Sequence, residues 1–171
     1  MTKYTACICE GGAETAILDL LLDLLEGEIL KTRKGKDFET RYLKKDFSGK
    51  ITVYRILDSR RENFKISKAY QHKVEVVNVI TAPEIEMLII CNEGKYQDFE
   101  KKKGMSPSEY CKSILKMKNV KSVSFVKEYF SDISVLEKSL HEYKRLSKVR
   151  KSEKTIYDLL RSEDNKKKME G

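Results

Sequence analysis

The sequence predicts an α/β fold, with a largely parallel β-sheet covered by helices on both faces. Short β-rich runs alternate along the chain with segments of helical periodicity, which is typical of this fold class. The 171 residues suffice for one domain with a substantial core and are too few for two ordinary domains. We therefore expect one α/β domain over residues 1–148, followed by a charged C-terminal helix or tail over residues 149–171.

The first half of the chain opens with a strand, a tight turn and a helix. The run KYTACIC at 3–9 is β-rich and ends at Glu10-Gly11-Gly12. Leu and Ile then recur at helical spacing from Ala13 to Leu25. Apolar runs separated by turn residues predict the elements that follow. They are a short strand at 28–32, a basic amphipathic segment at 37–47, a strand at 50–57, a helix at 64–72 and a strand at 74–81.

The second half is predicted to be mainly helical. Pro83 can occupy the first position of a helix over 84–92, although this run is short and apolar enough to be a strand. A capping box at 106–109 predicts a helix to about Met117. The remaining predicted elements are a last strand at 120–126 and a helix capped by Asp132 or Ser134 that runs to about Lys148. In the tail, the apolar residues Ile156, Leu159 and Leu160 pack either on the domain or on another subunit.

Composition indicates a soluble, cytoplasmic protein. No signal peptide is evident, and the longest apolar runs are too short to span a bilayer, so no membrane partner is expected. The four cysteines lie in apolar surroundings and are expected to be reduced. No dinucleotide-binding glycine motif, P-loop or serine-hydrolase elbow is present, which argues against those functions.

Charge is distributed unevenly along the chain. The net charge is +8, yet residues 1–30 carry six acidic residues and one lysine, whereas residues 31–73 carry fourteen Lys or Arg and five acidic residues. An acidic centre beside a basic surface is expected from this pattern. The basic surface either binds the phosphates of a nucleic acid or is a solvated lysine-rich surface.

Two acidic turns, each directly after a predicted strand, form the candidate site. Glu10 follows the first strand and Asp58 follows the strand at 50–57, so they converge on one crevice if those strands are neighbours. Grouped carboxylates at such a crevice can hold Mg²⁺ together with water and a substrate phosphate. Gly11 and Gly12 would allow a phosphate to approach the backbone. Alternatively, Glu10 and Glu14 only stabilise the N-terminus of a helix.

Three motifs carry a resemblance to a known family. EGGAE at 10–14 is similar to the EGxTE signature of the TOPRIM domain in OLD-type nucleases and RloB-like proteins, with Ala13 in place of threonine. RILDSRRENF resembles the family's strand that ends in a DxD motif, and APEIEMLIICNEG resembles its NPxFExWLLL segment. The three motifs occur in the family's order over roughly residues 4–100. The resemblance implies a TOPRIM-like (Rossmann-like) fold.

The resemblance also implies roles for individual residues. Glu10 matches the glutamate proposed as general acid/base, Asp58 the first metal-binding aspartate, and Glu86 the glutamate of PxFE. Arg60 occupies the position of the second aspartate, where a cation opposes a metal and favours a phosphate. The expected sets are catalytic Glu10, Asp58 and Glu86; metal-binding Glu10, Asp58, Glu14 and Glu62; and phosphate-binding Gly11, Gly12, Arg60 and Arg61.

The function expected from these features is phosphodiester cleavage. The protein would be a Mg²⁺- or Mn²⁺-dependent nuclease acting on DNA or RNA, and the resemblance implies a role in bacterial defence against phage. The alternative is a catalytically silent TOPRIM-like module that binds nucleic acid or a protein partner in a defence complex. A third possibility is an interaction domain whose charge only serves solubility. Asn92, Glu93 and Asp98 form either a second acidic edge or a helix end followed by a solvated helix start.

Overall fold

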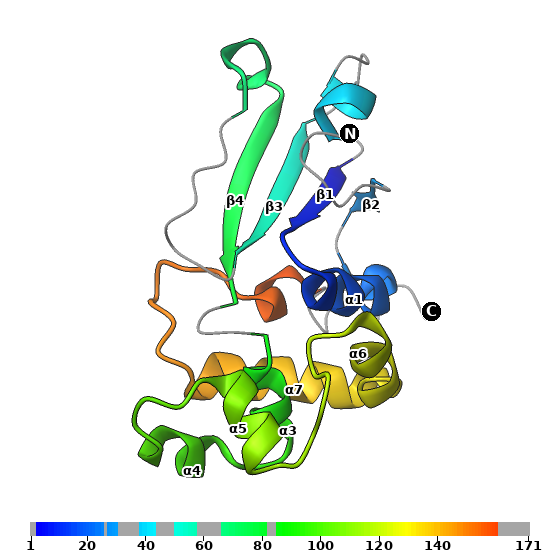
Figure 1. The fold of residues 1–171 in the computed structure, drawn as a ribbon. Helices are drawn as coiled ribbons and strands as arrows, with labels where there is room; N and C mark the ends of the chain where they lie inside the picture. The colour runs from blue at the N-terminus through cyan, green and yellow to red at the C-terminus, as the bar shows by residue number, and fades with distance from the viewer. Residues whose placement is uncertain are drawn as a thin grey trace, which may run out of the picture.

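The structure of the protein is a computed structural model of residues 1–171 (Figure 1). The residues that it describes are 3–25, 27–30, 38–43, 50–57, 66–81 and 85–160. They form a four-stranded, all-parallel sheet with helices, which confirms the α/β prediction and is consistent with a Rossmann-like fold. Within this part of the chain, no helix is long and apolar enough to cross a membrane.

The sheet has the strand order β2-β1-β3-β4. Its members are β1 (Tyr4–Cys9), β2 (Glu28–Ile29), β3 (Ile51–Leu57) and β4 (Val74–Ile80). All four lie where the sequence predicts strands. Because they run in parallel, their carboxyl ends meet at one edge of the sheet, which is where ligands bind in open α/β sheets.

Both faces of the sheet are buried. On one face, Ala6 and Ile8 of β1 pack with Val53 of β3. On the other face, Cys7 of β1 and Ile56 of β3 belong to the larger core that the helices complete. This alternation follows from the two-residue period of a strand. The four cysteines are free, and three of them are buried in the core.

Most of the described helices gather beyond the carboxyl ends of the strands (Figure 1). The α-helices are α1 (Gly12–Leu20), α3 (Met87–Asn92), α4 (Tyr96–Lys101), α5 (Pro107–Ser113), α6 (Val123–Tyr129) and α7 (Ile133–Leu146). The short 3₁₀-helices are η1 (Leu22–Leu24), η3 (Lys68–Tyr70) and η4 (Ile156–Leu159), and η2 (Glu39–Leu43) is a π-helix. Helices therefore cover most of the edge of the sheet where we expected a ligand to bind.

The predicted strand at 120–126 is wrong. Residues Val123–Tyr129 form helix α6, and the Ser122 hydroxyl caps it by accepting a hydrogen bond from the Phe125 amide at 3.2 Å. The alternation of valine and serine suggested a strand, but the cap and the burial of Val126 and Phe130 on one helical face decide the structure. The helix predicted to reach Met117 ends at Ser113 instead.

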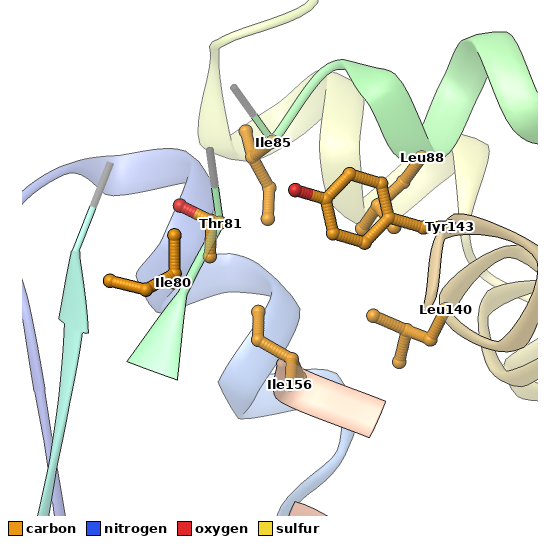
Figure 2. Close-up of a pocket in the computed structure, with 7 residues that line it drawn as sticks. All are labelled: Ile80, Thr81, Ile85, Leu88, Leu140, Tyr143 and Ile156. Atoms are coloured by element: carbon orange, nitrogen blue, oxygen red, sulfur yellow. The ribbon is translucent and has the colours of Figure 1, made fainter. Parts of the chain in front are cut away.

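Part of the predicted tail belongs to the core. Ile156 and Leu159 of η4 are buried, and the carbonyl of Lys154 accepts a hydrogen bond from the amide of Ile80 at 2.8 Å. Figure 2 shows Ile156 facing Leu140 and Tyr143 of α7 across a small apolar pocket. The open choice between the domain and another subunit is thus resolved in favour of the domain for these residues.

Candidate functional site

The two strands that precede the predicted site residues Glu10 and Asp58 are neighbours in the sheet. β1 and β3 pair in parallel, with Cys9 opposite Ile56, so the chain leaves both strands at the same edge. This satisfies the condition on which the convergence of Glu10 and Asp58 depended. Four predicted site residues lie outside the described part of the chain: Asp58, Arg60, Arg61 and Glu62.

Glu10 lies directly after β1 and pairs with a residue that sequence reasoning missed. Its Oε1 atom lies 3.5 Å from Nη2 of Arg55, and the two side chains are 23% and 15% exposed. Arg55 lies in the neighbouring strand β3, opposite Ile8 of β1. A charged residue inside the apolar run ITVYRIL was the available signal, because such a position calls for a partner of opposite charge. Glu10 is therefore held beside a cation.

Both glycines lie where a side chain would meet a close neighbour. Gly11 is the N-cap of α1 with an extended backbone, and a methyl group added to it would lie 2.5 Å from Oε2 of Glu14. A methyl group added to Gly12 would lie 3.1 Å from the side chain of Val123 in α6. Glu14, in the first turn of α1, is 8% exposed and folds back over Gly11. A carboxylate at this position also stabilises the helix N-terminus.

A pocket of about 180 Å³ lies at this turn. Its lining residues are Gly11, Gly12, Ala13, Glu14, Ile85, Glu86 and Lys121. We call it the carboxylate pocket. It brings together Gly11, Gly12, Glu14 and Glu86, which come from two segments that the sequence analysis selected separately. Counting Lys121, its lining carries an excess of one negative charge.

Glu86 is the most buried carboxylate of the pocket. It is 1% exposed, and its Oε1 atom lies 3.1 Å from Nζ of Lys121, whose side chain is 59% exposed. Lys121 was missed because the segment around it was predicted to be a strand. Since the segment before α6 is instead a loop, Lys121 can reach across to Glu86. A buried carboxylate is therefore paired with a lysine at the surface.

The residues at the pocket meet part of what a divalent cation needs. Mg²⁺ and Mn²⁺ prefer hard oxygen ligands, and Mg²⁺ is commonly held by one or two carboxylates with the other positions left to water and phosphate. Glu14 and Glu86 supply two such carboxylates to one pocket. Within the described ranges, no group of three or more His, Cys, Asp or Glu is placed to hold a metal. Glu14 and Glu86 are therefore only two carboxylates at one pocket, and the Oε1 atom of Glu86 already lies beside Lys121.

The other acidic candidates serve the packing of helices. Asn92 donates a hydrogen bond to the Tyr129 hydroxyl at 2.8 Å, and that hydroxyl donates to Glu93 at 2.5 Å. Tyr110 donates to Asp98 at 2.5 Å. These contacts link α3 to α6 and α4 to α5. They account for the three residues Asn92, Glu93 and Asp98 without a second acidic edge.

No protein-family model, curated protein or solved structure significantly matches this chain. The TOPRIM resemblance accordingly rests on the three motifs and their order.

Proposed function

We propose that the chain is a TOPRIM-like nucleic-acid-processing protein that hydrolyses phosphodiester bonds with Mg²⁺ or Mn²⁺. The observation that supports this most is the carboxylate pocket, in which Glu14 and Glu86 lie together beside the turn that carries Glu10. The pocket lies where the first strand of a parallel sheet ends, which is the usual place for a ligand in such folds. In this proposal the protein acts in the cytoplasm, and the resemblance suggests defence against phage.

The proposed roles follow from the charges. Glu14 and Glu86 would hold the metal together with Asp58, and Glu62 is a further candidate ligand. The bound metal would activate a water molecule and neutralise charge that develops on the phosphoryl group. Glu10 would accept the proton, with its carboxylate oriented by Arg55. Lys121 would face the substrate phosphate, as would Arg60 and Arg61.

Cleavage assays test this proposal directly. Purified protein is incubated with single- and double-stranded DNA and RNA in Mg²⁺, in Mn²⁺ and in chelator. We expect metal-dependent cleavage that falls by roughly 100-fold or more in Glu10→Gln and Glu86→Gln. Glu75→Gln is the matched control, because Glu75 lies on β4 far from the carboxyl ends and pairs with Lys50. Absence of cleavage by the unmodified protein in every condition would refute the proposal.

The second candidate is a catalytically silent module that binds nucleic acid or a protein partner. It is favoured by the two ion pairs, Glu10 with Arg55 and Glu86 with Lys121, because each gives a proposed catalytic carboxylate a basic partner. The resemblance adds Arg60 at a position where the family has an aspartate. Salt-dependent binding of nucleic acid without cleavage, and without stabilisation by Mg²⁺ or Mn²⁺, would favour this candidate.

A further inference from the structure

A lysine-rich segment joins α5 to α6. Between Glu109 and Glu128 the sequence holds five lysines and no acidic residue. Lys116 and Asn119, in the loop after α5, both have φ of 58°, in the left-handed region. The lysines of this segment are exposed.

The loop and α5 form a groove of about 530 Å³. Its lining residues are Ser108, Lys112, Met117, Lys118, Asn119, Val120 and Lys121. We call it the lysine groove. Three of its seven lining residues are lysines and none is acidic, in contrast to the carboxylate pocket. Within the described part of the chain, Lys112 and Lys118 have no ion-pair partner, so two of these charges are available to an anion.

The lysine groove and the carboxylate pocket share one residue, Lys121. A ligand in the groove therefore lies next to the pocket that contains Glu14 and Glu86. Several lysines in a groove that adjoins a carboxylate site suit a polyanion that is held at more than one phosphate and processed at one point. A small single anion would not need this extent.

The size of the groove indicates which polyanion fits. The groove volume lies in the range of small-ligand sites, which suits a few nucleotides of a single strand better than a duplex. Grooves that follow a single strand use such cations to contact its backbone.

We propose that the lysine groove binds consecutive phosphates of a single nucleic-acid strand and guides that strand into the carboxylate pocket. This inference rests on the proposed function, since it names the track by which the substrate reaches the site. Lys112 and Lys118 contact phosphates, and Lys121 stands at the junction.

Binding in chelator tests the groove separately from catalysis. The anisotropy of fluorescently labelled 12-nucleotide DNA and RNA strands is followed over a range of salt concentrations for the unmodified protein and for Lys112→Gln/Lys118→Gln. We expect roughly tenfold weaker binding at low salt. The slope of log K against log salt should become shallower by about 1.4, from two contacts at about 0.7 each. Both lysines are exposed, so the melting temperature should not change.

The matched control is Lys101→Gln/Lys102→Gln, which removes the same charge from exposed lysines at the end of α4. It should keep most of the affinity. Equal loss in both double variants, or none in the groove variant, would overturn the groove while leaving the proposed function standing. Absence of strand binding by the unmodified protein at low salt would overturn both. An acidic peptide of equal charge that competes as well as the strand would show that the groove accepts any acidic chain, and would also overturn the proposal.

Discussion

The carboxylate of Glu86 is buried and lies 3.1 Å from the ammonium group of Lys121, which stands at the surface. This pair joins the segment after β4 to the loop before α6. It also connects two concave regions of opposite charge, because Lys121 lines both the carboxylate pocket and the lysine groove. Any ligand that displaces Lys121 from Glu86 would change the charge of the pocket.

Removing Lys121 should destabilise the fold through Glu86. In Lys121→Met the buried carboxylate loses a cation, and we expect a cost of about 1–2 kcal/mol, reduced from that of a fully buried pair because Lys121 is exposed. In a Glu86→Gln background the same change should cost less than about 0.5 kcal/mol. Urea unfolding of the unmodified protein, of the two single variants and of the double variant measures the coupling free energy between Lys121 and Glu86. Lys127→Met, on α6, is the control; equal costs in both backgrounds would disprove the dependence.

Gly11 should be intolerant of a side chain only while Glu14 is present. A methyl group at Gly11 would lie 2.5 Å from Oε2 of Glu14, whereas the backbone φ of −120° suits alanine. We expect Gly11→Ala to cost about 1 kcal/mol, and to cost little in a Glu14→Ala background. Chemical denaturation checks this. If Gly11→Ala is equally costly in both backgrounds, the glycine serves something other than the approach of Glu14.

Ile156 should behave as a core residue although it lies in the predicted tail. It is 2% exposed and faces Leu140 and Tyr143 across the pocket of about 10 Å³, which has no more room than one water molecule (Figure 2). Ile156→Ala should cost about 2–4 kcal/mol of unfolding free energy. Ile114→Ala is the matched control, because Ile114 is 43% exposed and should cost less than about 0.5 kcal/mol. Similar costs at the two positions would contradict the packing of η4.

Much of the fold could be predicted because its signals are local. The four strands are short apolar runs bounded by turn residues, and the Glu10-Gly11-Gly12 turn marks the start of α1. Helix α6 was missed because VKSVSFV alternates like a strand, while its helical state depends on packing against α1 and on the Ser122 cap. The same error hid Lys121, since a residue in a predicted central strand is not expected at a pocket.

The partners of the candidate site depend on tertiary structure and so could not be predicted. Glu10 and Arg55 are 45 residues apart, and their contact requires the β1–β3 register. Glu14 and Glu86 line one pocket only because the start of α3 lies beside the turn before α1. Sequence reasoning selected the individual acidic residues of the site, but it could not assign their partners.

Stability should fall at high pH through Tyr110. Burial, together with its hydrogen bond to Asp98, raises the pKa of Tyr110 to about 12. An unfolded tyrosine ionises near pH 10, so between about pH 10 and 12 the unfolded chain releases a proton that the folded chain keeps, and stability decreases.

The same hydrogen bond also affects stability at low pH. It lowers the pKa of Asp98 below 3.8, so the stability that the ionised Asp98 contributes is lost as the pH falls below that value.

Tyr110→Phe should reduce the loss of unfolding free energy both at alkaline and at acidic pH, as measured by urea unfolding from pH 2 to 12. Some alkaline loss will remain, because burial also raises the pKa of Tyr129. Tyr157→Phe, near the surface beside His141, serves as the control and should keep both losses. An unchanged alkaline loss in Tyr110→Phe would show that this hydroxyl does not retain its proton.

The pairing of Glu10 with Arg55 should oppose metal binding, and removing Arg55 tests whether the site is silent for that reason. Arg55 lies 3.5 Å from the carboxylate that the proposed mechanism needs, and a cation at that distance repels a divalent metal. We expect Arg55→Gln to show a larger rise in melting temperature with Mg²⁺ or Mn²⁺ than the unmodified protein, because one positive charge beside the proposed metal site is then removed. Lys50→Gln is the matched control, since Lys50 precedes β3 at its other end and pairs with Glu75 of β4 at 3.3 Å. It should leave the metal response unchanged. If Arg55→Gln responds to metal no more than Lys50→Gln does, then Arg55 does not set the affinity for metal.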